Sequence, residues 1–275
     1  MKEKRIKFIA SDLDGTLLLN GAQKVSQELI PLIKRLNDNG IIFCAASGRQ
    51  YPNLKRLFGD VADDMMYICE NGSVIIYKDK LVDKTPMDTG LGREIIRAIT
   101  GVGQCEVLVS GERTSYLKPK SEAYLVRMRD IVRNDICLVD DLEHIREDYV
   151  KISVYDPAGI QNSQDFFLNE FAGRAQACVS GKQWLDYTAQ GVNKGSAIKT
   201  IQRLMHFDAE ECVAFGDNFN DIEMFQAVGH PVVMKQAVEK VKEYAQYETE
   251  CVEDSLIAII AVSYTHLRAH ETELH

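Results

Sequence analysis

The most constraining feature of this chain is the segment Asp-Leu-Asp-Gly-Thr at residues 12–16, which follows directly on an apolar run. Residues 5–11 read as a strand, and alternate side chains of a strand point the same way. Asp12 and Asp14 would therefore leave the end of a buried strand together. Two carboxylates about 4 Å apart repel by about 4 kcal/mol at an effective dielectric constant of about 20. A fold that keeps them so close needs a metal ion, a shared proton or solvent, so the pair predicts chemistry at this strand end.

Strand and helix patterns alternate at both ends of the chain. The first alternation covers residues 1–77 and includes a continuous apolar strand at 41–47, as in a parallel sheet covered on both faces. The second begins near residue 193 with helix 193–205, strand 211–217 and a later helix at 236–246. The two flanks together predict one doubly wound α/β domain.

The middle of the chain has a different pattern. Residues 82–188 carry several patterns of half-exposed strands, interrupted by helical stretches at 121–133 and 162–172. This pattern predicts an α+β insertion, so the expected division is a core of residues 1–81 and 189–261 around an inserted domain of 82–188.

The last residues, 262–275, follow abruptly on a helical pattern and have no periodicity of their own. They resemble one reading frame of the transposase adapter used in DNA sequencing libraries, and we expect them to be a non-native tail. His266 and His270 have i, i+4 spacing, but inside such a tail they do not indicate a metal site.

Composition narrows the possible partners. The net charge of −9 argues against a nucleic-acid or anionic-membrane partner, because both need a basic surface. No run approaches the roughly 18 apolar residues of a membrane span. Seven scattered cysteines without a CxxC pair read as reduced thiols. We expect a cytoplasmic protein that is a monomer or a weak homodimer.

Four segments carry chemical side chains, and each lies at the end of a predicted strand or the start of a predicted helix. They are 12–16, 47–49, 193–195 and 216–224. Ligands of open α/β sheets bind outside the carboxyl ends of the strands. We therefore expect all four segments to meet in one crevice.

The side chains in that crevice suit a phosphoryl group. Asp12, Asp14, Asp217 and Asp221 supply acidic oxygens, which favour Mg²⁺ over zinc. Ser47 offers a hydroxyl among backbone N–H groups, and Lys194 offers a positive charge. A metal, a cation and hydrogen-bond donors together are what phosphoryl transfer needs, and an in-line carboxylate can act as nucleophile.

These four segments, DLDGT, SGR, NKG and GDNFND in that order, resemble the four motifs of the haloacid dehalogenase superfamily. The large insertion between the second and third motifs is similar to that of the Cof-type phosphatases. The resemblance extends to about residue 260. It implies a Rossmann-like core with a mobile cap at roughly 82–188.

The resemblance also implies roles for the motif residues. Asp12 would be the nucleophile and a Mg²⁺ ligand. Asp14 would be the general acid/base, with its backbone carbonyl on the metal. Asp217 would ligate Mg²⁺, and Asp221 would support the metal shell. The phosphate would be held by the residues Leu13 (through its backbone N–H), Ser47, Gly48, Lys194 and Asn220.

The implied activity is Mg²⁺-dependent hydrolysis of small phosphomonoesters, such as sugar phosphates or phosphorylated cofactors, through an aspartyl-phosphate. A phosphomutase or phosphotransferase, and a non-catalytic regulator that binds phosphometabolites, remain alternatives. Asn71 either lines the site or only forms an Asn-Gly turn, and Arg49 reads as a structural or entrance residue. We expect Gln236 to lie away from the chemical residues. In the cap, substrate contacts could come from Arg113, Tyr116, Lys118, Arg127 and Trp184.

Overall fold

The larger of two sheets in this computed structural model has eight strands. The structure describes residues 4–272, apart from the side chains of 263–272. In spatial order the strands are β14 (Tyr247–Thr249), β13 (His230–Met234), β12 (Cys212–Gly216), β1 (Phe8–Asp12), β2 (Ile42–Ala46), β3 (Met66–Cys69), β4 (Val74–Tyr77) and β5 (Lys80–Lys84). The six from β14 to β3 are parallel, and β4 and β5 are antiparallel additions.

Both faces of this sheet are buried, as the continuous apolar strand at 41–47 predicts. Ile9 and Phe43 pack on one face, and Phe8 and Cys44 pack on the other. The first face is covered by α1 (Leu29–Asp38), α2 (Tyr51–Lys55) and α9 (Val252–Thr272), and the second by α6 (Lys194–Met205), α7 (Ile222–Gln226) and α8 (Glu239–Lys242). The prediction of a doubly wound Rossmann-like core is confirmed.

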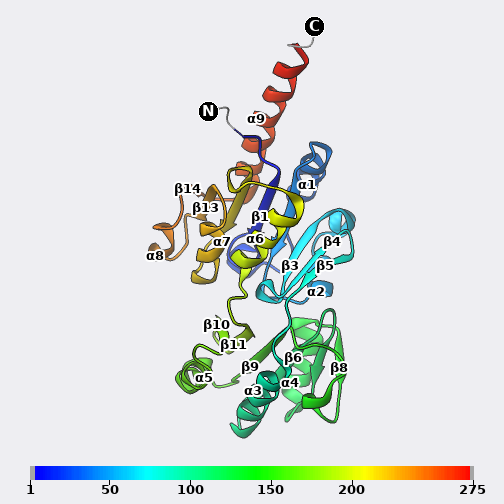
Figure 1. The fold of residues 1–275 in the computed structure, drawn as a ribbon, viewed down its shortest axis with the longest axis vertical. Helices are drawn as coiled ribbons and strands as arrows, with labels where there is room; N and C mark the ends of the chain where they lie inside the picture. The colour runs from blue at the N-terminus through cyan, green and yellow to red at the C-terminus, as the bar shows by residue number, and fades with distance from the viewer. Residues whose placement is uncertain (1–3, 273–275) are drawn as a thin grey trace.

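The smaller sheet has six strands and lies below the core in Figure 1. Its spatial order is β10 (Ala175–Gly181), β11 (Trp184–Ala189), β9 (Lys151–Tyr155), β6 (Glu106–Ser110), β7 (Ser115–Leu117) and β8 (Ile136–Leu138). Its apolar face packs against α3 (Thr89–Gly101) and α5 (Gln164–Glu170), and α4 (Glu122–Val126) lies beside it. We call this second unit the cap.

Alternation along the cap strands separates two faces. On β9, Ile152 and Val154 pack into the helix-covered core of the cap. Lys151 and Ser153 alternate with them and line a cavity between the cap and the core sheet. One face of the cap sheet is therefore covered by α3 and α5. The other is partly covered by α4 and partly lines the cavity next to the carboxyl ends of the core strands.

The chain passes between the two sheets close to the expected boundaries. The predicted boundary at residue 82 falls inside β5, whose Asp83 and Lys84 still pair with β4 in the core sheet. The first passage therefore lies after Lys84. The chain leaves the cap sheet at Ala189, the end of β11. The division into two folding units stays a prediction.

Several elements differ from the sequence expectation. The sequence does not predict helix α3 or strands β5, β8 and β14, and the helix expected at 236–246 is confined to α8. The segment of α3, TGLGREIIRAITG, contains three glycines, which disfavour a helix. Burial of Ile95, Ile96 and Ile99 against the cap sheet outweighs that preference.

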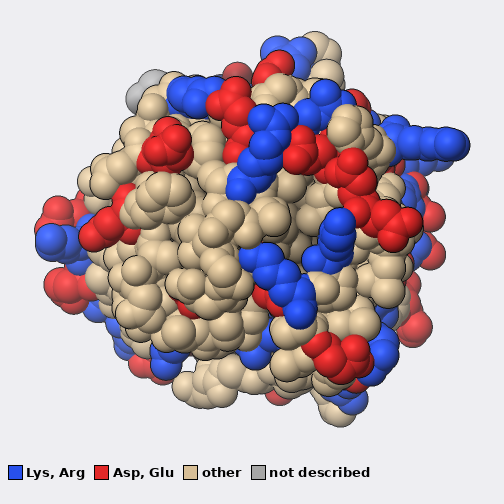
Figure 2. Space-filling model, turned by 90° about the horizontal axis from the view of Figure 1, so that it is seen from below, with Lys and Arg blue, Asp and Glu red and all other residues tan. Residues whose placement is uncertain are grey.

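The described ends of the chain both lie at the end of the core that is farthest from the cap (Figure 1). None of the helices in the described part of the chain has both the length and the apolar character that crossing a membrane requires. Figure 2 views the cap end and shows Lys and Arg interspersed with Asp and Glu on that face.

Candidate active site

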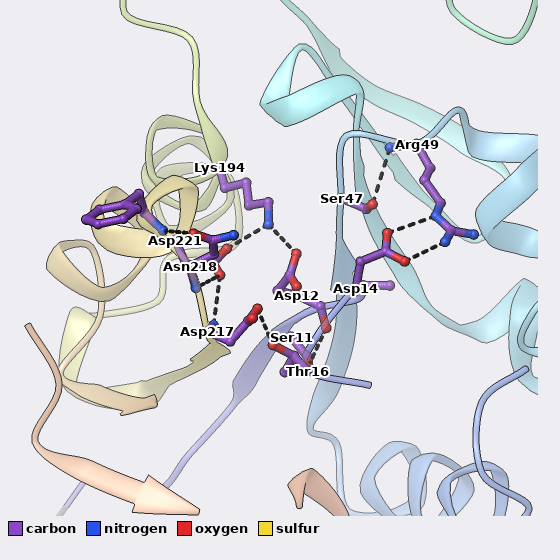
Figure 3. Close-up of polar contacts among 12 residues, drawn as sticks. Ser11, Asp12, Asp14, Thr16, Ser47, Arg49, Lys194, Asp217, Asn218 and Asp221 are labelled. Atoms are coloured by element: carbon purple, nitrogen blue, oxygen red, sulfur yellow. Dashed lines mark hydrogen bonds and ion pairs between the residues drawn. The ribbon is translucent and has the colours of Figure 1, made fainter. Parts of the chain in front are cut away.

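Asp12 and Lys194 form the centre of the site. Asp12 is the last residue of β1 and is 6% exposed, and Lys194 is the first residue of α6 and is 2% exposed. Lys194 Nζ donates to Asp12 Oδ1 and, at 2.7 Å, to Asp221 Oδ1 (Figure 3). Lys194, from the second half of the chain, thus contacts the carboxylate of Asp12 at the end of β1.

Helix α6 starts at this point because Asn193 caps it. The Asn193 side chain accepts from the Ser196 N–H at 2.8 Å, and Ser196 Oγ accepts from the Asn193 N–H at 3.0 Å. This reciprocal capping fixes the first turn of the helix. It also fixes Lys194 at the helix end that faces Asp12.

Asp217 and Asp221 complete an acidic group with Asp12. One carboxylate oxygen from each of the three lies within 4.8 Å of the others. Asp221 is fully buried, and its Oδ2 accepts from the N–H groups of Asp217 (3.0 Å) and Asn218 (3.2 Å). These bonds hold the turn after β12, so Asp221 positions Asp217 as well as contacting Lys194.

The electrostatics of this group favour a bound cation. Burial raises the pKa of Asp12 well above its ordinary value, although the Lys194 charge opposes the shift. Burial and the Asp221 charge raise the pKa of Asp217 to about 6. Three carboxylates gathered this closely are a suitable ligand set for Mg²⁺, which would favour the ionised forms of Asp12 and Asp217. The donor set therefore fits the metal that the sequence predicts.

Asp14 is turned away from the acidic group. Its carboxylate receives two hydrogen bonds from Arg49, Nε at 3.0 Å and one terminal nitrogen at 2.5 Å (Figure 3). The Asp14 side chain is 58% exposed. The structure therefore brings the Asp12, Asp217 and Asp221 carboxylates together but holds the Asp14 carboxylate beside Arg49.

Three of the five predicted phosphate-binding residues line one cavity beside Asp12, and Leu13 and Lys194 do not line it. Ser47, Gly48 and Asn220 line a cavity of about 290 Å³, together with Asp12, Asp14 and Asn71. Ser47 follows β2, and its Oγ accepts from the Arg49 N–H at 3.3 Å.

Leu13 is fully buried, and its carbonyl accepts from the N–H groups of Thr16 and Leu18. The four motifs thus meet at the carboxyl ends of the core strands, as predicted.

Gly15 of the first motif is required by both space and backbone. Its φ is +98°, and a Cβ at this position would lie 2.3 Å from Asp217 Oδ2. Any side chain would therefore strain the backbone and displace a predicted metal ligand.

The cap contributes part of the cavity wall. Of the five cap residues considered from the sequence, only Trp184 lines this cavity. Arg113 instead donates to Asp79 of the core, Tyr116 donates to Glu147, and Arg127 lies over the Tyr155 ring. The remaining cap wall comes from Leu108, Met128, Val132, Asn134, Lys151, Ser153, Ser180 and Asp186.

Several contacts of the site have no counterpart in the sequence analysis. Thr16 donates to Asp217 Oδ1 at 3.3 Å, and its place in the first motif could have indicated this. Gln236 Nε2 donates to the Gly15 carbonyl of the first motif at 3.1 Å, next to but not on a predicted chemical residue. Lys151, Glu70 and Asp186 form a buried charged cluster between cap and core, which no local pattern indicates.

Comparison with known proteins agrees with this architecture. The chain is 25% identical over 243 residues to 5-amino-6-(5-phospho-D-ribitylamino)uracil phosphatase YbjI of Escherichia coli, covering 88% of this chain and 90% of that protein. It is 27% identical to HMP-PP phosphatase of Klebsiella pneumoniae, covering 86% of each chain. A crystal structure of a Eubacterium rectale protein superposes with a TM-score of 0.82 at 27% identity, covering 95% of this chain and 99% of that one. The family model of the haloacid dehalogenase-like hydrolases matches residues 9–260, and the chain belongs to this family.

Proposed function

We propose that this hydrolase is a Mg²⁺-dependent phosphatase of small phosphomonoesters and that it works through an aspartyl-phosphate on Asp12. The observation that carries the proposal is the contact of Lys194 Nζ with both Asp12 and Asp221. Asp12 lines the cavity that Ser47 and Asn220 also line. Relatives named as phosphatases support the reaction class.

Asp12 is the nucleophile in this proposal. Its Oδ1 is held by Lys194, so the carboxylate has a fixed orientation and its other oxygen can attack phosphorus. Lys194 stays protonated because the Asp12 and Asp221 charges raise its pKa against the effect of burial. A fixed cation beside the nucleophile also stabilises charge on the phosphoryl oxygens in the transition state.

Ser47 and Asn220 bind the phosphoryl oxygens with Lys194. Both side chains carry donors, and both line the cavity beside Asp12. The backbone N–H groups of Leu13 and Gly48 add donors in the same role. Hydrogen bonds to an anion are about twice as strong as bonds between neutral groups, so this set binds and orients phosphate.

Asp12, Asp217 and the backbone carbonyl of Asp14 would hold Mg²⁺, with Asp221 supporting them. The metal supplies positive charge that offsets the anionic phosphate and favours ionised carboxylates. The hydrogen bond from the Asp217 N–H to Asp221 fixes the turn after β12, so it would also fix Asp217 as a ligand of the metal.

Asp14 gives a proton to the leaving oxygen and later takes one from water. In the structure its carboxylate is paired with Arg49. Rotation of the Asp14 side chain would break its hydrogen bonds to Arg49 and bring its carboxyl group to the leaving oxygen of the substrate. Asp14 lines the cavity and is exposed, so the rotation displaces no packed core.

The cavity favours a small leaving group. Its volume is about 290 Å³, and the apolar part of its cap wall includes Leu108, Met128 and Trp184. Among the described residues all seven cysteines are free thiols, which fits action in the reducing cytoplasm.

The Asp12→Asn variant tests the proposal. It should abolish Mg²⁺-dependent hydrolysis of an aryl phosphate while circular dichroism and thermal unfolding stay close to wild type. Asp38→Asn, an exposed carboxylate at the end of α1, is the matched control and should retain full activity. Turnover by Asp12→Asn comparable to wild type would contradict the mechanism.

Analysis of the products separates hydrolysis from transfer. A phosphatase releases inorganic phosphate into water at the rate of alcohol formation, whereas a phosphomutase moves the group to a second hydroxyl. Incubation with a hexose bisphosphate should therefore yield monophosphate and free phosphate. An isomeric bisphosphate as the main product would overturn the assignment.

A further inference from the structure

A buried charged cluster joins the cap to the core beside the active site. Lys151 and Asp186 come from cap strands β9 and β11, and Glu70 and Asn71 come from the turn between core strands β3 and β4. The exposed fractions of these four side chains lie between 1% and 8%. All four residues line the cavity that contains Asp12.

Lys151 makes its contacts across the boundary between cap and core. Its Nζ lies 2.7 Å from Glu70 Oε2 and donates to the Gly48 carbonyl at 2.5 Å. Within the cap, Asp186 Oδ2 lies 3.7 Å from the same Nζ. Asp186 also accepts from Asn71 Nδ2 at 2.8 Å, so the cluster is bound to the core at one further point.

The contact with Gly48 completes a pattern on the phosphate-binding loop. The Ser47 carbonyl accepts from the Asn71 N–H at 3.1 Å, and the Arg49 carbonyl accepts from the Glu70 N–H at 3.2 Å. Lys151 Nζ binds the carbonyl between them. Three successive carbonyls of the loop are thus held by donors, two from the β3–β4 turn and one from the cap.

The turn that supplies two of these donors has an unusual backbone. Glu70 and Asn71 have φ values of +51° and +58°, in the left-handed region that residues other than glycine rarely adopt. Such conformations cost free energy and persist where surrounding contacts hold them. Here the ion pair of Glu70 and the Asn71–Asp186 hydrogen bond supply those contacts from the cap.

Lys151 is positively charged in this environment. Burial alone would lower the pKa of its ammonium group, but the Asp186 and Glu70 charges outweigh burial and raise the pKa. A charged donor gives a stronger hydrogen bond to a carbonyl than a neutral one does. The bond to Gly48 therefore joins a cation of the cap to the loop that would bind the phosphate.

We propose that Lys151 is a positioning residue of the phosphatase: by binding the Gly48 carbonyl from the cap, it holds the Ser47–Gly48 loop in the geometry that binds the phosphoryl group. This inference rests on the proposed function of the same site. It predicts that phosphate affinity depends on Lys151 even for a ligand without a leaving group.

The test measures competitive inhibition by inorganic phosphate and by orthovanadate, with Mg²⁺ present and an aryl phosphate as substrate. Lys151→Met should weaken both inhibitors by about tenfold, the scale of one lost hydrogen bond to a charged group. Lys151→Arg keeps the charge and donors and should recover a large part of that affinity. Equal inhibition of wild type and Lys151→Met would overturn the proposal, and so would a loss that is confined to the larger organic substrates.

Asp79→Asn is the matched control. Asp79 accepts from cap residue Arg113 at 3.0 Å on the outer rim, so its loss loosens the cap–core boundary away from the loop. It should leave phosphate inhibition within about twofold of wild type. An equal loss in both variants would show that cap closure in general, rather than the Gly48 contact, sets phosphate affinity.

Two outcomes need to be kept apart. If Lys151→Met fails to fold because Glu70 is left buried and unpaired, the comparison moves to Glu70→Gln against the Glu70→Gln/Lys151→Met double variant, which carries no unpaired charge at these two positions. If wild type itself releases no phosphate with Mg²⁺, the proposed function fails. If wild type is active and the Lys151 variants bind phosphate as wild type does, only the positioning role fails.

Discussion

At the residue scale, the motif glycine Gly15 shows how tightly the site is packed. A Cβ there would lie 2.3 Å from Asp217 Oδ2, and the φ of +98° disfavours any L side chain. Gly15→Ala should therefore displace Asp217 and lower kcat by about a hundredfold, the effect expected when a catalytic group shifts by about 1 Å. Steady-state kinetics over a range of Mg²⁺ concentrations would measure this loss.

Gly21→Ala is the control for backbone strain alone. Gly21 has a φ of +75° but nothing within 4 Å of its Cβ position. It should reduce thermal stability and leave kcat close to wild type. A similar loss of kcat in both variants would mean that strain, and not the clash with Asp217, impairs the enzyme.

The acidic group predicts a pH dependence of the metal-free protein. Burial and the Asp221 charge raise the pKa of Asp217 from 3.8 to about 6. The folded state thus binds this proton more tightly than the unfolded state does. The resulting stability is fully present below about pH 4 and is lost as the pH rises through about 6.

In the proposed site Mg²⁺ would bind the ionised carboxylates and should offset this loss. The rise in melting temperature on adding Mg²⁺ should therefore be larger at about pH 8 than at about pH 5. Scanning fluorimetry with a chelator or with millimolar Mg²⁺ measures it. Asp217→Asn should reduce the difference between the two pH values, and an unchanged difference would exclude Asp217 as its source.

At the element scale, the capped first turn of helix α6 positions Lys194. Asn193 caps the helix through Ser196, and the next residue is Lys194. Asn193→Ala should lower the free energy of unfolding by about 1 kcal/mol, the usual value of such a cap. Denaturant titration measures the change. Asn193→Ser keeps an oxygen acceptor and should recover most of the stability, so equal losses in the two variants would contradict a capping role.

The elements that the sequence predicted well are those with local signals. Strand 41–47 is a continuous apolar run, and the motifs after β1, β2 and β12 meet because the carboxyl ends of parallel strands share one edge. Helix α3 is not predicted because its three glycines disfavour a helix locally, and packing against the cap sheet stabilises it. The Lys151–Glu70 ion pair is not predicted either. It depends on how the cap sheet lies over the core, and no single segment of the sequence determines that arrangement.

At the scale of the whole molecule, the cap is held on the core around the site. Gln50 donates to the Arg113 carbonyl at 2.7 Å and accepts from the Asp135 N–H at 2.9 Å, so one core side chain joins two cap loops. Trp184, the single tryptophan of the chain, lies in the cavity wall between cap and core. Its fluorescence should therefore report how the cap sits on the core.

Gln50→Ala should increase quenching of Trp184 fluorescence by acrylamide, because the cap would open more often. Orthovanadate with Mg²⁺ should protect Trp184 in wild type and do so less in the variant. Gln23→Ala is the control, since the Gln23 side chain donates to Gly21 within the core. Identical quenching in Gln50→Ala and wild type would show that this contact does not hold the cap.

The place of β1 in the core sheet has a consequence for how the protein is made. Phe8 of β1 pairs with Ile42 of β2 on one side and with Cys212 of β12 on the other. On the ribosome, β1 with Asp12 at its end is synthesised long before β12, the strand that pairs with its second edge. Until β12 emerges, β1 offers an apolar edge to any other chain, and unpaired edges of this kind promote aggregation. Nascent chains that stop before residue 212 should therefore depend on chaperones, and the active site forms only when synthesis is nearly complete.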